Sequence, residues 1–431
     1  MKVAIIGAGY VGLTTGACLA HLGHNVTCAD IDAERVARLS KGEIPIHEEG
    51  LAALVNDGLT NRRLSFVVGA ANAARGAEIV FLCVQTPQGE DGAADLTYVE
   101  NVAREIAPVL APGTVVVNKS TVPVGSTRYV QRVMSEAGAS TDHVTVASNP
   151  EFLREGQAVR DFLEPDRIVI GCEDPGAAVR VSELYRGIHA PLLVTDPASA
   201  EMIKYASNAF LATKVSFINA IANLCEAVDA DVREVALGMG YDKRIGFEFL
   251  RPGPGYGGSC FPKDTAALLH TSLKAGYNFD VLHGVVDVNR QQHERMVDKV
   301  RVASGRELSD AVVAVWGLTF KADTDDLRDS PALVIASRLL EAGATVRAYD
   351  PIAGEQAAIR MPGLDVHADP YDAAAGADVV ALLTEWDEFR WLDFNRVREA
   401  MRHPAIVDAR NLLDPSAMRR RGFVYDGVGR R

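Results

Sequence analysis

Short runs of apolar, largely β-branched residues recur along the chain, and longer stretches with the helical spacing of apolar residues separate them. A run of this kind between turn-forming residues is typical of a buried strand. The runs lie at residues 2–6, 25–29, 78–84, 114–118 and 144–147, and again at residues 311–317, 345–349, 377–386 and 405–410. Strands that alternate with helices predict two mostly parallel sheets, whose ligands bind at the carboxyl ends of the strands.

A long stretch without helix breakers separates the two predicted sheets. Residues 198–228 contain neither glycine nor proline, which predicts a helix much longer than the globular average. Asp196 and Pro197 before it are typical of a helix N-cap and a first helical residue. Because a helix of this length needs partners on several sides, we expect it to join the two blocks and to contribute to a homodimer interface.

The length of the chain sets the expected number of domains. At 431 residues it is too long for a single core. We therefore expect an α/β protein with two Rossmann-like, doubly wound parallel-sheet domains joined by the long central helix. The first domain comprises residues 1–195 and the last residues 301–431. Between them, residues 196–300 form a helical domain with the linking helix and a cysteine-containing loop.

The composition restricts the partners and the compartment. A formal net charge of −13 argues against a nucleic-acid partner, and the apolar runs are too short to predict a membrane span. The first residues lead directly into a glycine-rich turn, so no targeting segment is predicted. The six cysteines, at positions 18, 28, 83, 172, 225 and 260, show neither a CxxC pair nor a metal-ligand spacing. This pattern indicates a reducing, cytoplasmic location and no metal site.

The first predicted strand runs directly into the sequence GAGYVG at residues 7–12, and a helix follows. In this setting Gly7 makes the tight turn, Gly9 lets a pyrophosphate approach the backbone, and Gly12 lets the helix pack on the strand. Asp30 ends the second strand, about 20 residues after the turn. A carboxylate there binds the adenosine ribose and repels a 2′-phosphate, so the pattern predicts NAD as the cofactor.

Residues 251–264, RPGPGYGGSCFPKD, combine glycines and prolines with a single cysteine. Glycine lets a backbone approach a ligand closely, and proline fixes the path of the chain. Lys263, or a helix N-terminus, would favour the thiolate form of Cys260. The pattern therefore predicts a nucleophilic cysteine on a shaped loop, with Asp264 beside it. The alternative is a small buried hydrophobic residue, as most free cysteines are.

Lys204 and Asn208 lie four residues apart in the predicted central helix and therefore share one of its faces. A solvated lysine and asparagine on an exposed face would be the more ordinary arrangement. Apolar residues around the pair favour a buried helix instead. These residues are Met202, Ile203, Tyr205, Phe210 and Leu211.

The last block begins with a strand and a glycine at residues 311–317, which repeats the plan of residues 1–30. Asp350 takes the place of Asp30, but the remaining glycines of the turn are replaced by a segment that ends in Lys321. The exchange of glycine for lysine favours a nucleotide other than a second NAD. The alternative is a domain that serves only as a lid or in dimerisation.

Several motifs together resemble the UDP-glucose/GDP-mannose dehydrogenase family, whose members oxidise C6 of a nucleotide sugar. The resemblance extends over nearly the whole chain, and its motifs are specific in combination. They lie at residues 7–12, 120–125, 149–156, 257–264 and 321–328. The segment 249–257 is similar to that of members that act on UDP-glucose, so the resemblance implies UDP-glucose as substrate and UDP-glucuronate as product.

The resemblance implies two successive oxidations at C6, from alcohol through aldehyde to acid, with one NAD reduced in each. In this scheme Cys260 attacks the aldehyde to give a thiohemiacetal. Oxidation of the thiohemiacetal leaves a thioester, which water hydrolyses.

Five further residues are implied to act with the cysteine. Lys204 and Asn208 would bind the oxyanion that develops at C6. Asp264 would order a water molecule or support proton transfer, and Glu151 would assist the hydrolysis of the thioester. Thr121 would contribute to the water network.

The resemblance also implies the binding residues. The NAD contacts fall on Gly7, Gly9, Val11, Gly12, Asp30, Arg35, Thr86, Thr121, Glu155, Lys263 and Arg328. The nucleotide-sugar contacts fall on Glu151, Phe152, Leu153, Lys204, Asn208, Phe249, Leu250, Gly257 and Lys321. Family members often carry lysine in the place of Arg35, which keeps the charge but changes its geometry. Arg328 of the last domain would reach the NAD of the first, so that closure assembles the site.

Two other interpretations stay open. The same chemistry would also suit another nucleotide sugar, either GDP-mannose or UDP-N-acetylmannosamine. A non-catalytic NAD-binding regulator would keep the fold, since fold does not imply function. Such a regulator predicts the loss of the thiol or of its helpers. Cys260 and the five residues implied to act with it are all present, which favours an enzyme.

We expect the protein to prefer NAD strongly over NADP, because the Asp30 carboxylate repels a 2′-phosphate. The replacement Asp30→Ala should lower the affinity for NAD and reduce the preference for NAD over NADP. The measurement is the initial rate of reduction of each cofactor at saturating UDP-glucose, for the wild type and the variant. Equal use of both cofactors by the wild type would show that Asp30 points elsewhere.

Overall fold

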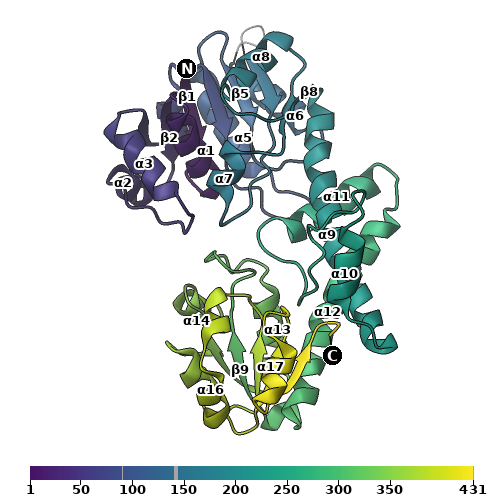
Figure 1. The fold of residues 1–431 in the computed structure, drawn as a ribbon. Helices are drawn as coiled ribbons and strands as arrows, with labels where there is room; N and C mark the ends of the chain where they lie inside the picture. Colours follow the sequence, from purple (N-terminus) through teal and green to yellow (C-terminus); the bar gives the residue numbers. More distant parts are fainter. Residues whose placement is uncertain (90, 140–143, 431) are drawn as a thin grey trace. The chain divides into compact units, whose positions relative to one another are not determined.

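The chain forms two compact units, drawn in Figure 1. The first unit consists of residues 1–207 and 266–277, and the second of residues 208–265 and 278–431. The computed structural model describes residues 1–89, 91–139 and 144–430. The boundaries of the three expected domains stay a prediction.

The first unit is built on a sheet of eight strands among the described residues, in the order β3-β2-β1-β4-β5-β6-β7-β8. Neighbouring strands are parallel except β6 and β7, which pair in the antiparallel sense. The strands are β1 Lys2–Ile6, β2 Asn25–Asp30, β3 Leu64–Val68, β4 Ile79–Leu82, β5 Val115–Asn118, β6 Thr145–Ser148, β7 Ile168–Gly171 and β8 Leu192–Thr195.

Helices cover both faces of this sheet. Val3 and Ile5 of β1 lie in one buried cluster, with residues of α1, α2, α3, α7 and α8. Ala4 and Ile6 lie in the other, with residues of α4, α5 and α6. These helices are α1 Tyr10–His21, α2 Ala33–Ser40, α3 Leu51–Thr60, α4 Ala70–Ala74, α5 Thr97–Ile106, α6 Ser126–Glu136, α7 Ala158–Leu163 and α8 Pro175–Glu183, with the 3₁₀ turn η1 Ala107–Val109. Burial on both faces explains why the strands read as continuous apolar runs.

The second unit has a smaller sheet, in which the described strands follow the order β11-β10-β9-β12-β13-β14 and are all parallel. Its central strand β9 also buries alternate residues in two clusters. On one side Trp316 stacks on Phe389, with ring centroids 5.5 Å apart. The strands are β9 Val312–Trp316, β10 Thr345–Tyr349, β11 Asp365–Val366, β12 Val379–Leu382, β13 Ala405–Asp408 and β14 Val424–Gly427.

The helices of the second unit likewise cover both faces of its sheet. Residues of α10, α12, α13 and α14 pack on one side, and residues of α15, η3, α16 and α17 on the other. Their bounds are α10 Val232–Gly240, α12 Asp280–Ser304, η2 Leu308–Asp310, α13 Pro331–Glu341, α14 Gly354–Arg360, α15 Pro370–Ala374, η3 Asp387–Trp391, α16 Phe394–Ala400 and α17 Pro415–Arg420. The predicted fold class, two doubly wound α/β sheets with a long helix between them in the chain, is confirmed.

Five of the described strands, β3, β7, β8, β11 and β14, lie outside the runs that predicted strands. Four of these five are the outermost strands of their sheets. The strands β3, β11 and β14 include a polar residue and so do not form continuous apolar runs, whereas β7 and β8 are short, largely apolar runs that went unrecognised as strands.

Two helices run from one unit into the other: α9 Pro197–Val228 and α11 Phe261–Lys274. The predicted cap of α9 is confirmed, because Asp196 Oδ1 accepts a hydrogen bond from Ser199 N at 2.9 Å. Among the described residues α9 is the one helix long and apolar enough to cross a membrane. Length and composition alone do not assign it to a membrane, because core helices of water-soluble proteins share them.

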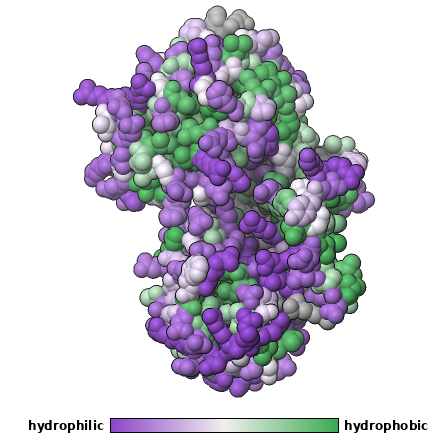
Figure 2. Space-filling model, in the orientation of Figure 1, coloured by the Kyte–Doolittle hydropathy of each residue, from purple (hydrophilic) through white to green (hydrophobic). Residues whose placement is uncertain are grey.

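The expectation that α9 is buried on several sides is only partly met. Lys204 and Asn208 are buried, but Met202 and Phe210 are exposed. Further along the helix, Phe217, Leu224 and Val228 are exposed as well. In Figure 2 apolar residues reach the surface at the right of the view, where Figure 1 places α9 and α10. The apolar stripe of α9 therefore has no partner within the described residues of one chain.

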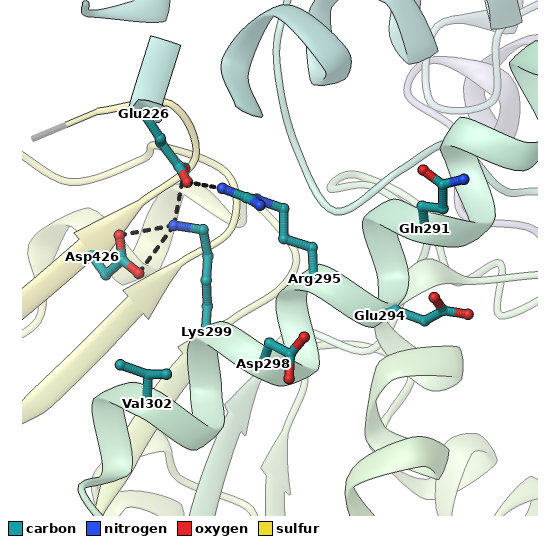
Figure 3. Close-up of a pocket in the computed structure, with 8 residues that line it drawn as sticks. All are labelled: Glu226, Gln291, Glu294, Arg295, Asp298, Lys299, Val302 and Asp426. Atoms are coloured by element: carbon teal, nitrogen blue, oxygen red, sulfur yellow. Dashed lines mark hydrogen bonds and ion pairs between the residues drawn. The ribbon is translucent and has the colours of Figure 1, made fainter. Parts of the chain in front are cut away.

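Ion pairs in the second unit join the last strand to two helices. Lys299 of α12 lies 2.9 Å from Glu226 Oε1 of α9 and 3.0 Å from Asp426 Oδ1 of β14 (Figure 3). Arg295 of α12 also pairs with Glu226. Beyond β14, Gly429 N donates to Glu226 Oε1 at 2.8 Å. These groups line a polar cleft with an excess of carboxylates, and they fix the end of the chain against α9 and α12.

Candidate functional site

The glycine turn of the first unit forms a cradle of backbone atoms. Gly7 has a φ of 97°, which favours glycine. A Cβ on Gly12 would lie 1.8 Å from the carbonyl oxygen of Gly7, so only glycine fits there. A Cβ on Gly9 would meet no atom within 4 Å. The space above Gly9, at the start of α1, fits the pyrophosphate of a dinucleotide.

Asp30 ends β2 beside this turn. Its Oδ2 accepts a hydrogen bond from Ala8 N at 2.9 Å, and its Oδ1 accepts one from Asp32 N at 3.0 Å. Arg35 Nη1 lies 3.5 Å from the same carboxylate. The carboxylate is thereby fixed next to the turn, at the place where an adenosine ribose binds in this type of sheet.

The loops that follow β4 and β5 are tied to each other. Thr86 Oγ1 donates to the carbonyl oxygen of Thr121 at 2.8 Å, and both threonines are buried. Ser120 Oγ donates to the carbonyl oxygen of Val84 at 2.6 Å. Both loops lie at carboxyl ends of central strands, where ligands of such sheets bind. Val11 lies in the first turn of α1.

Glu151 and Lys204 form a buried ion pair in the first unit. Lys204 Nζ of α9 lies 2.9 Å from Glu151 Oε1, and the two side chains are only 5% and 6% exposed. Burial alone would raise the pKa of Glu151. The adjacent Lys204 ammonium, a hydrogen bond from Leu153 N and the charge of Lys119 outweigh burial and hold this pKa below its ordinary value. Glu151 is therefore a carboxylate at neutral pH.

The loop after β6 carries other predicted residues. The ring of Phe152 lies against the Arg167 guanidinium, 3.7 Å from the ring centroid, and Lys204 Nζ is 5.4 Å from the same centroid. Leu153 N donates to Glu151 Oε2 at 2.6 Å. Glu155 belongs to the same loop and is half-buried. Phe152, Leu153 and Glu151 are thus brought together with Lys204.

Sequence reasoning missed Glu201, which lies one turn before Lys204 on α9. Its carboxylate is 2% exposed and accepts hydrogen bonds from Gly125 N at 2.6 Å and Thr127 N at 2.8 Å. It thereby holds the first turn of α6 and the end of the loop that contains Thr121. The sequence did contain a signal, because Glu201 lies three residues before Lys204 and so shares a helix face with a lysine predicted to be buried.

Cys260 of the second unit stands directly before α11. Its carbonyl oxygen accepts a hydrogen bond from Asp264 N at 2.9 Å, which makes it the N-cap residue. Asp264 is buried, and its Oδ2 accepts a hydrogen bond from Asn208 Nδ2 at 2.6 Å. Lys263 pairs with the other oxygen of the same carboxylate. The structure therefore brings Asn208 of α9 and Lys263 to the carboxylate of Asp264, in the first turn of α11 after Cys260.

The other cysteines differ from Cys260 in their surroundings. Burial raises the pKa of the Cys18 thiol to about 12, and that of the Cys83 thiol to about 12 as well. Burial also raises the pKa of the Cys28 thiol. These thiols stay protonated at neutral pH and pack as apolar groups. Cys260 is partly exposed at a helix N-terminus, which is the setting of a reactive thiol.

The remaining predicted residues of the second unit lie near the same loop or in the segment after β9. Leu250 is buried, and Phe249 has a φ of 62°, with its ring 6.1 Å from that of Phe261. A Cβ on Gly257 would lie 2.0 Å from the carbonyl oxygen of Asp329. The segment after β9 carries Lys321, whose ammonium lies 5.5 Å from the Phe320 ring centroid, and Arg328, which pairs with Asp326.

Sequence comparison assigns the family. The models of the UDP-glucose/GDP-mannose dehydrogenase family match residues 1–189 as its NAD binding domain, residues 198–291 as its central domain and residues 314–415 as its UDP binding domain. The chain belongs to this family. It is an NAD-dependent nucleotide-sugar dehydrogenase, and the cradle of Gly7, Gly9 and Gly12 beside Asp30 fits the cofactor.

Individual relatives match along the whole chain. The UDP-glucose 6-dehydrogenase of Rhizobium meliloti is 48% identical over 436 residues, with 100% of both chains covered. That of Pseudomonas aeruginosa is 45% identical over 442 residues, with 100% of this chain and 98% of the relative covered. A solved UDP-glucose dehydrogenase from Pyrobaculum islandicum superposes with a TM-score of 0.92 at 37% identity, covering 100% of this chain and 98% of that one.

The buried ion pair leads to a prediction about stability. Lys204→Met should lower the stability of the first unit by about 3–5 kcal/mol, because Glu151 is then a buried charge without its partner. The double variant Lys204→Met/Glu151→Leu should lose less stability, because it leaves no buried charge of this pair without a partner. The measurement is thermal unfolding of each variant. Arg160→Met is the matched control, because Arg160 pairs with Glu164 on the surface of the same unit and should change little.

The same pair predicts the pH dependence of stability. Folding lowers the pKa of Glu151 below its ordinary value of 4.5. The contribution of Glu151 to the free energy of unfolding is therefore complete above pH 4.5, and it is lost as the pH falls through the pKa of the folded state. The double variant should lack this loss. A Lys204→Met variant as stable as the wild type at pH 7 would contradict the pairing.

Proposed function

We propose that the protein oxidises C6 of UDP-glucose to the carboxylate of UDP-glucuronate, with two molecules of NAD reduced per product. The observation that carries the proposal is the buried 2.6 Å hydrogen bond from Asn208 to Asp264, one turn of α11 from the Cys260 thiol. The identity of 45–48% with UDP-glucose 6-dehydrogenases over their full length supports the choice of sugar.

Cys260 is the nucleophile of the proposed reaction. The first oxidation removes a hydride from C6 and the proton of its hydroxyl, and leaves an aldehyde. Cys260 Sγ then bonds to C6 and the thiol proton passes to the oxygen, which gives a thiohemiacetal. NAD, when bound, accepts the hydride in each of the two oxidations. The second oxidation removes a hydride from C6 and the proton of its hydroxyl, and leaves a thioester. Water adds to the thioester, the C–S bond breaks, the Cys260 thiol is regenerated and the acid is released.

Lys204 and Asn208 are the proposed donors to the oxygen on C6. They lie four residues apart on α9, and each is already held by a carboxylate: Lys204 by Glu151, and Asn208 by Asp264. Donors that are fixed before the reaction stabilise a developing oxyanion without reorganising. The ammonium and the amide are therefore suited to both oxidation steps.

Glu151, Asp264 and Thr121 are the proposed groups that handle water and protons. Glu151 stays ionised at neutral pH because Lys204 lowers its pKa, so it is able to accept a proton from the water that attacks the thioester. Asp264 would order a water molecule beside the thiol. Thr121, fixed through its carbonyl oxygen by Thr86, would extend the water network.

The binding residues form two proposed sets. NAD would be held by Gly7, Gly9, Val11, Gly12, Asp30, Arg35, Thr86, Thr121, Glu155, Lys263 and Arg328. The nucleotide sugar would be held by Glu151, Phe152, Leu153, Lys204, Asn208, Phe249, Leu250, Gly257 and Lys321.

A homodimer through α9 is part of the proposal. Phe210, Phe217 and Leu224 recur every two turns along one stripe of α9 and are exposed, and a second copy of the same stripe would cover them. The proposed compartment is the cytoplasm. Six cysteines spread over 431 residues, without a CxxC pair, fit a compartment in which thiols stay reduced.

The experiment that tests the function is a substrate panel. The protein is mixed with NAD and, in turn, UDP-glucose, UDP-galactose, GDP-mannose and UDP-N-acetylmannosamine, and NADH absorbance is followed. UDP-glucose should give the highest kcat/KM and two NADH per acid formed. A higher kcat/KM for another sugar would identify that sugar as the substrate. No change in absorbance with any of the four would favour a non-catalytic regulator.

We predict that Cys260→Ser binds both ligands but forms acid more slowly by a factor on the order of a hundred or more. A hydroxyl is far harder to ionise than a thiol, and an ester is hydrolysed less readily than a thioester. Calorimetry checks binding, and chromatography of UDP-glucuronate checks turnover. Cys225→Ser is the control, because Cys225 lies in the buried core of the second unit. Acid formation at the wild-type rate by Cys260→Ser would exclude the covalent mechanism.

A further inference from the structure

The segment that leads to Cys260 is irregular yet buried. Residues 251–260, called here the cysteine loop, contain no helix or strand, and residues 252–258 are buried. Buried backbone N–H and C=O groups need hydrogen-bond partners, and outside regular structure the backbone does not supply them by itself. The partners of this loop therefore determine its path.

Three buried side-chain amides bind the backbone of the cysteine loop. Asn289 Oδ1 accepts from Tyr256 N at 2.8 Å, and Asn289 Nδ2 donates to the carbonyl oxygen of Tyr256 at 3.1 Å. Asn219 Oδ1 accepts from Gly253 N at 2.8 Å, and Gln292 Nε2 donates to the carbonyl oxygen of Gly253 at 2.8 Å. A carboxamide has the same donor and acceptor as a peptide group, so these side chains replace the neighbouring strand that the loop lacks.

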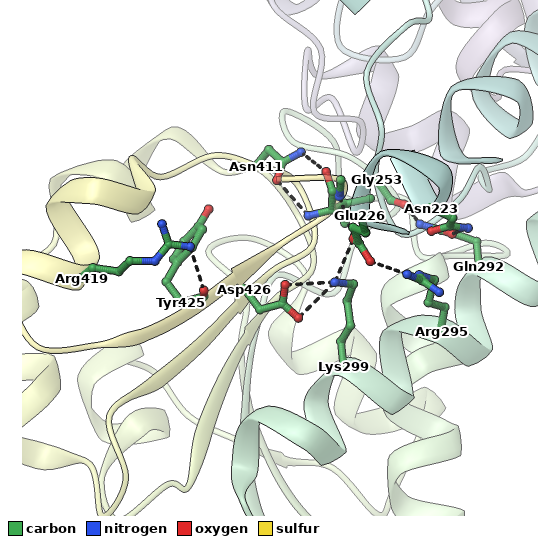
Figure 4. A network of polar contacts seen from close by, with 12 residues as sticks. Asn223, Glu226, Gly253, Gln292, Arg295, Lys299, Asn411, Arg419, Tyr425 and Asp426 are labelled. Atoms are coloured by element: carbon green, nitrogen blue, oxygen red, sulfur yellow. Dashed lines mark hydrogen bonds and ion pairs between the residues drawn. The ribbon is translucent and has the colours of Figure 1, made fainter. Parts of the chain in front are cut away.

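Burial and one further hydrogen bond restrict the orientation of the amides. Asn219 and Gln292 are fully buried, and Asn223 Nδ2 donates to Gln292 Oε1 at 3.2 Å (Figure 4). Asn289 is 8% exposed. Asn289 and Gln292 lie on the buried face of α12, which otherwise carries Leu282 and other apolar residues. Polar residues at such positions are costly unless both of their groups are used. Asn289 and Gln292 use both groups, whereas Asn219 binds the loop through its oxygen alone.

Close packing restricts the loop further. A Cβ on Gly255 would lie 2.7 Å from Asn289 Oδ1 and 2.8 Å from His293 Nε2 of α12. On Gly258 it would lie 2.8 Å from the ring of Phe320. The loop is therefore fixed by hydrogen bonds at Gly253 and Tyr256 and by contact on more than one side.

We propose that Asn219, Asn289 and Gln292 are positioning residues that set the place of the Cys260 thiol by holding the backbone of the cysteine loop. The inference rests on the proposed role of Cys260 as nucleophile. Tyr256 is four residues from Cys260, so a shift of its backbone is transmitted to the thiol over a short length of chain.

A displaced thiol has a specific chemical consequence. The first oxidation does not involve the S–C bond, so it continues and yields aldehyde and NADH. Capture of the aldehyde requires Sγ within bonding reach of C6, and a misplacement of about 1 Å can cost a factor on the order of a hundred. Aldehyde that is not captured leaves the protein, so NADH formed per acid rises above two.

The experiment compares two neighbouring glutamines on α12. Gln292→Leu removes the donor to Gly253, whereas Gln291 is exposed and Gln291→Leu is the matched control. NADH is measured by absorbance, acid by chromatography, and released aldehyde by trapping with semicarbazide. Gln292→Leu should release aldehyde and lower acid formation about tenfold or more, while Gln291→Leu keeps two NADH per acid. Equal ratios in the two variants would overturn the proposal.

A second variant and a second readout cover the case in which Gln292→Leu folds poorly. Asn289→Asp keeps an acceptor for Tyr256 N and removes the donor to its carbonyl oxygen. It should also release aldehyde. Alkylation of Cys260 by iodoacetamide, followed by mass spectrometry, should change in rate by about threefold or more relative to Gln291→Leu. An unchanged alkylation rate together with an unchanged NADH ratio would contradict the positioning role.

The Cys260→Ser variant separates this inference from the proposed function. If that variant forms acid at the wild-type rate, the nucleophile is wrong and the function must be revised. If it forms acid as slowly as predicted while Gln292→Leu and Asn289→Asp behave as Gln291→Leu does, the function stands and the positioning role alone is rejected.

Discussion

The need to pair buried polar groups on α9 determines much of the candidate site. Glu201, Lys204, Asn208 and Asn219 are all buried on this helix, and an unpaired charge or amide there would be strongly destabilising. In the first unit the partners are the start of α6 and the loop after β6; in the second they are the start of α11 and the cysteine loop. Each partner carries, or directly adjoins, a predicted site residue.

The same pairing suits these groups to their proposed chemical roles. Lys204 keeps Glu151 ionised in a buried position, and Asp264 fixes the amide of Asn208. In the first unit a carboxylate and an ammonium, and in the second unit an amide, are therefore fixed in orientation, which suits the roles proposed for them. Cys260 differs from the buried cysteines because the cysteine loop places it at a helix N-terminus rather than in a core.

Much of this followed from local patterns in the sequence. Apolar runs predicted the central strands, the stretch without breakers predicted α9, and the glycines of the turn marked a backbone that approaches a ligand. Such features depend on spacing within a few residues, since strand and helix periods are local. The exposed Phe210 was misjudged as buried because an apolar stripe on a helix marks a face that needs a partner but does not show where that partner lies.

The amides that hold the cysteine loop could not be recognised in this way. Gln291 and Gln292 are adjacent and identical in type, yet one is exposed and the other is buried against Gly253. Which of them meets a backbone depends on how α12 packs on α9 and on a loop more than thirty residues away, as it also does for Asn289. The sequence by itself determined the elements and the reactive residue types, because these depend on local periodicity and side-chain chemistry. Only the tertiary structure decided which polar side chains support them, because a hydrogen bond forms between atoms that packing, and not the order of the chain, brings together.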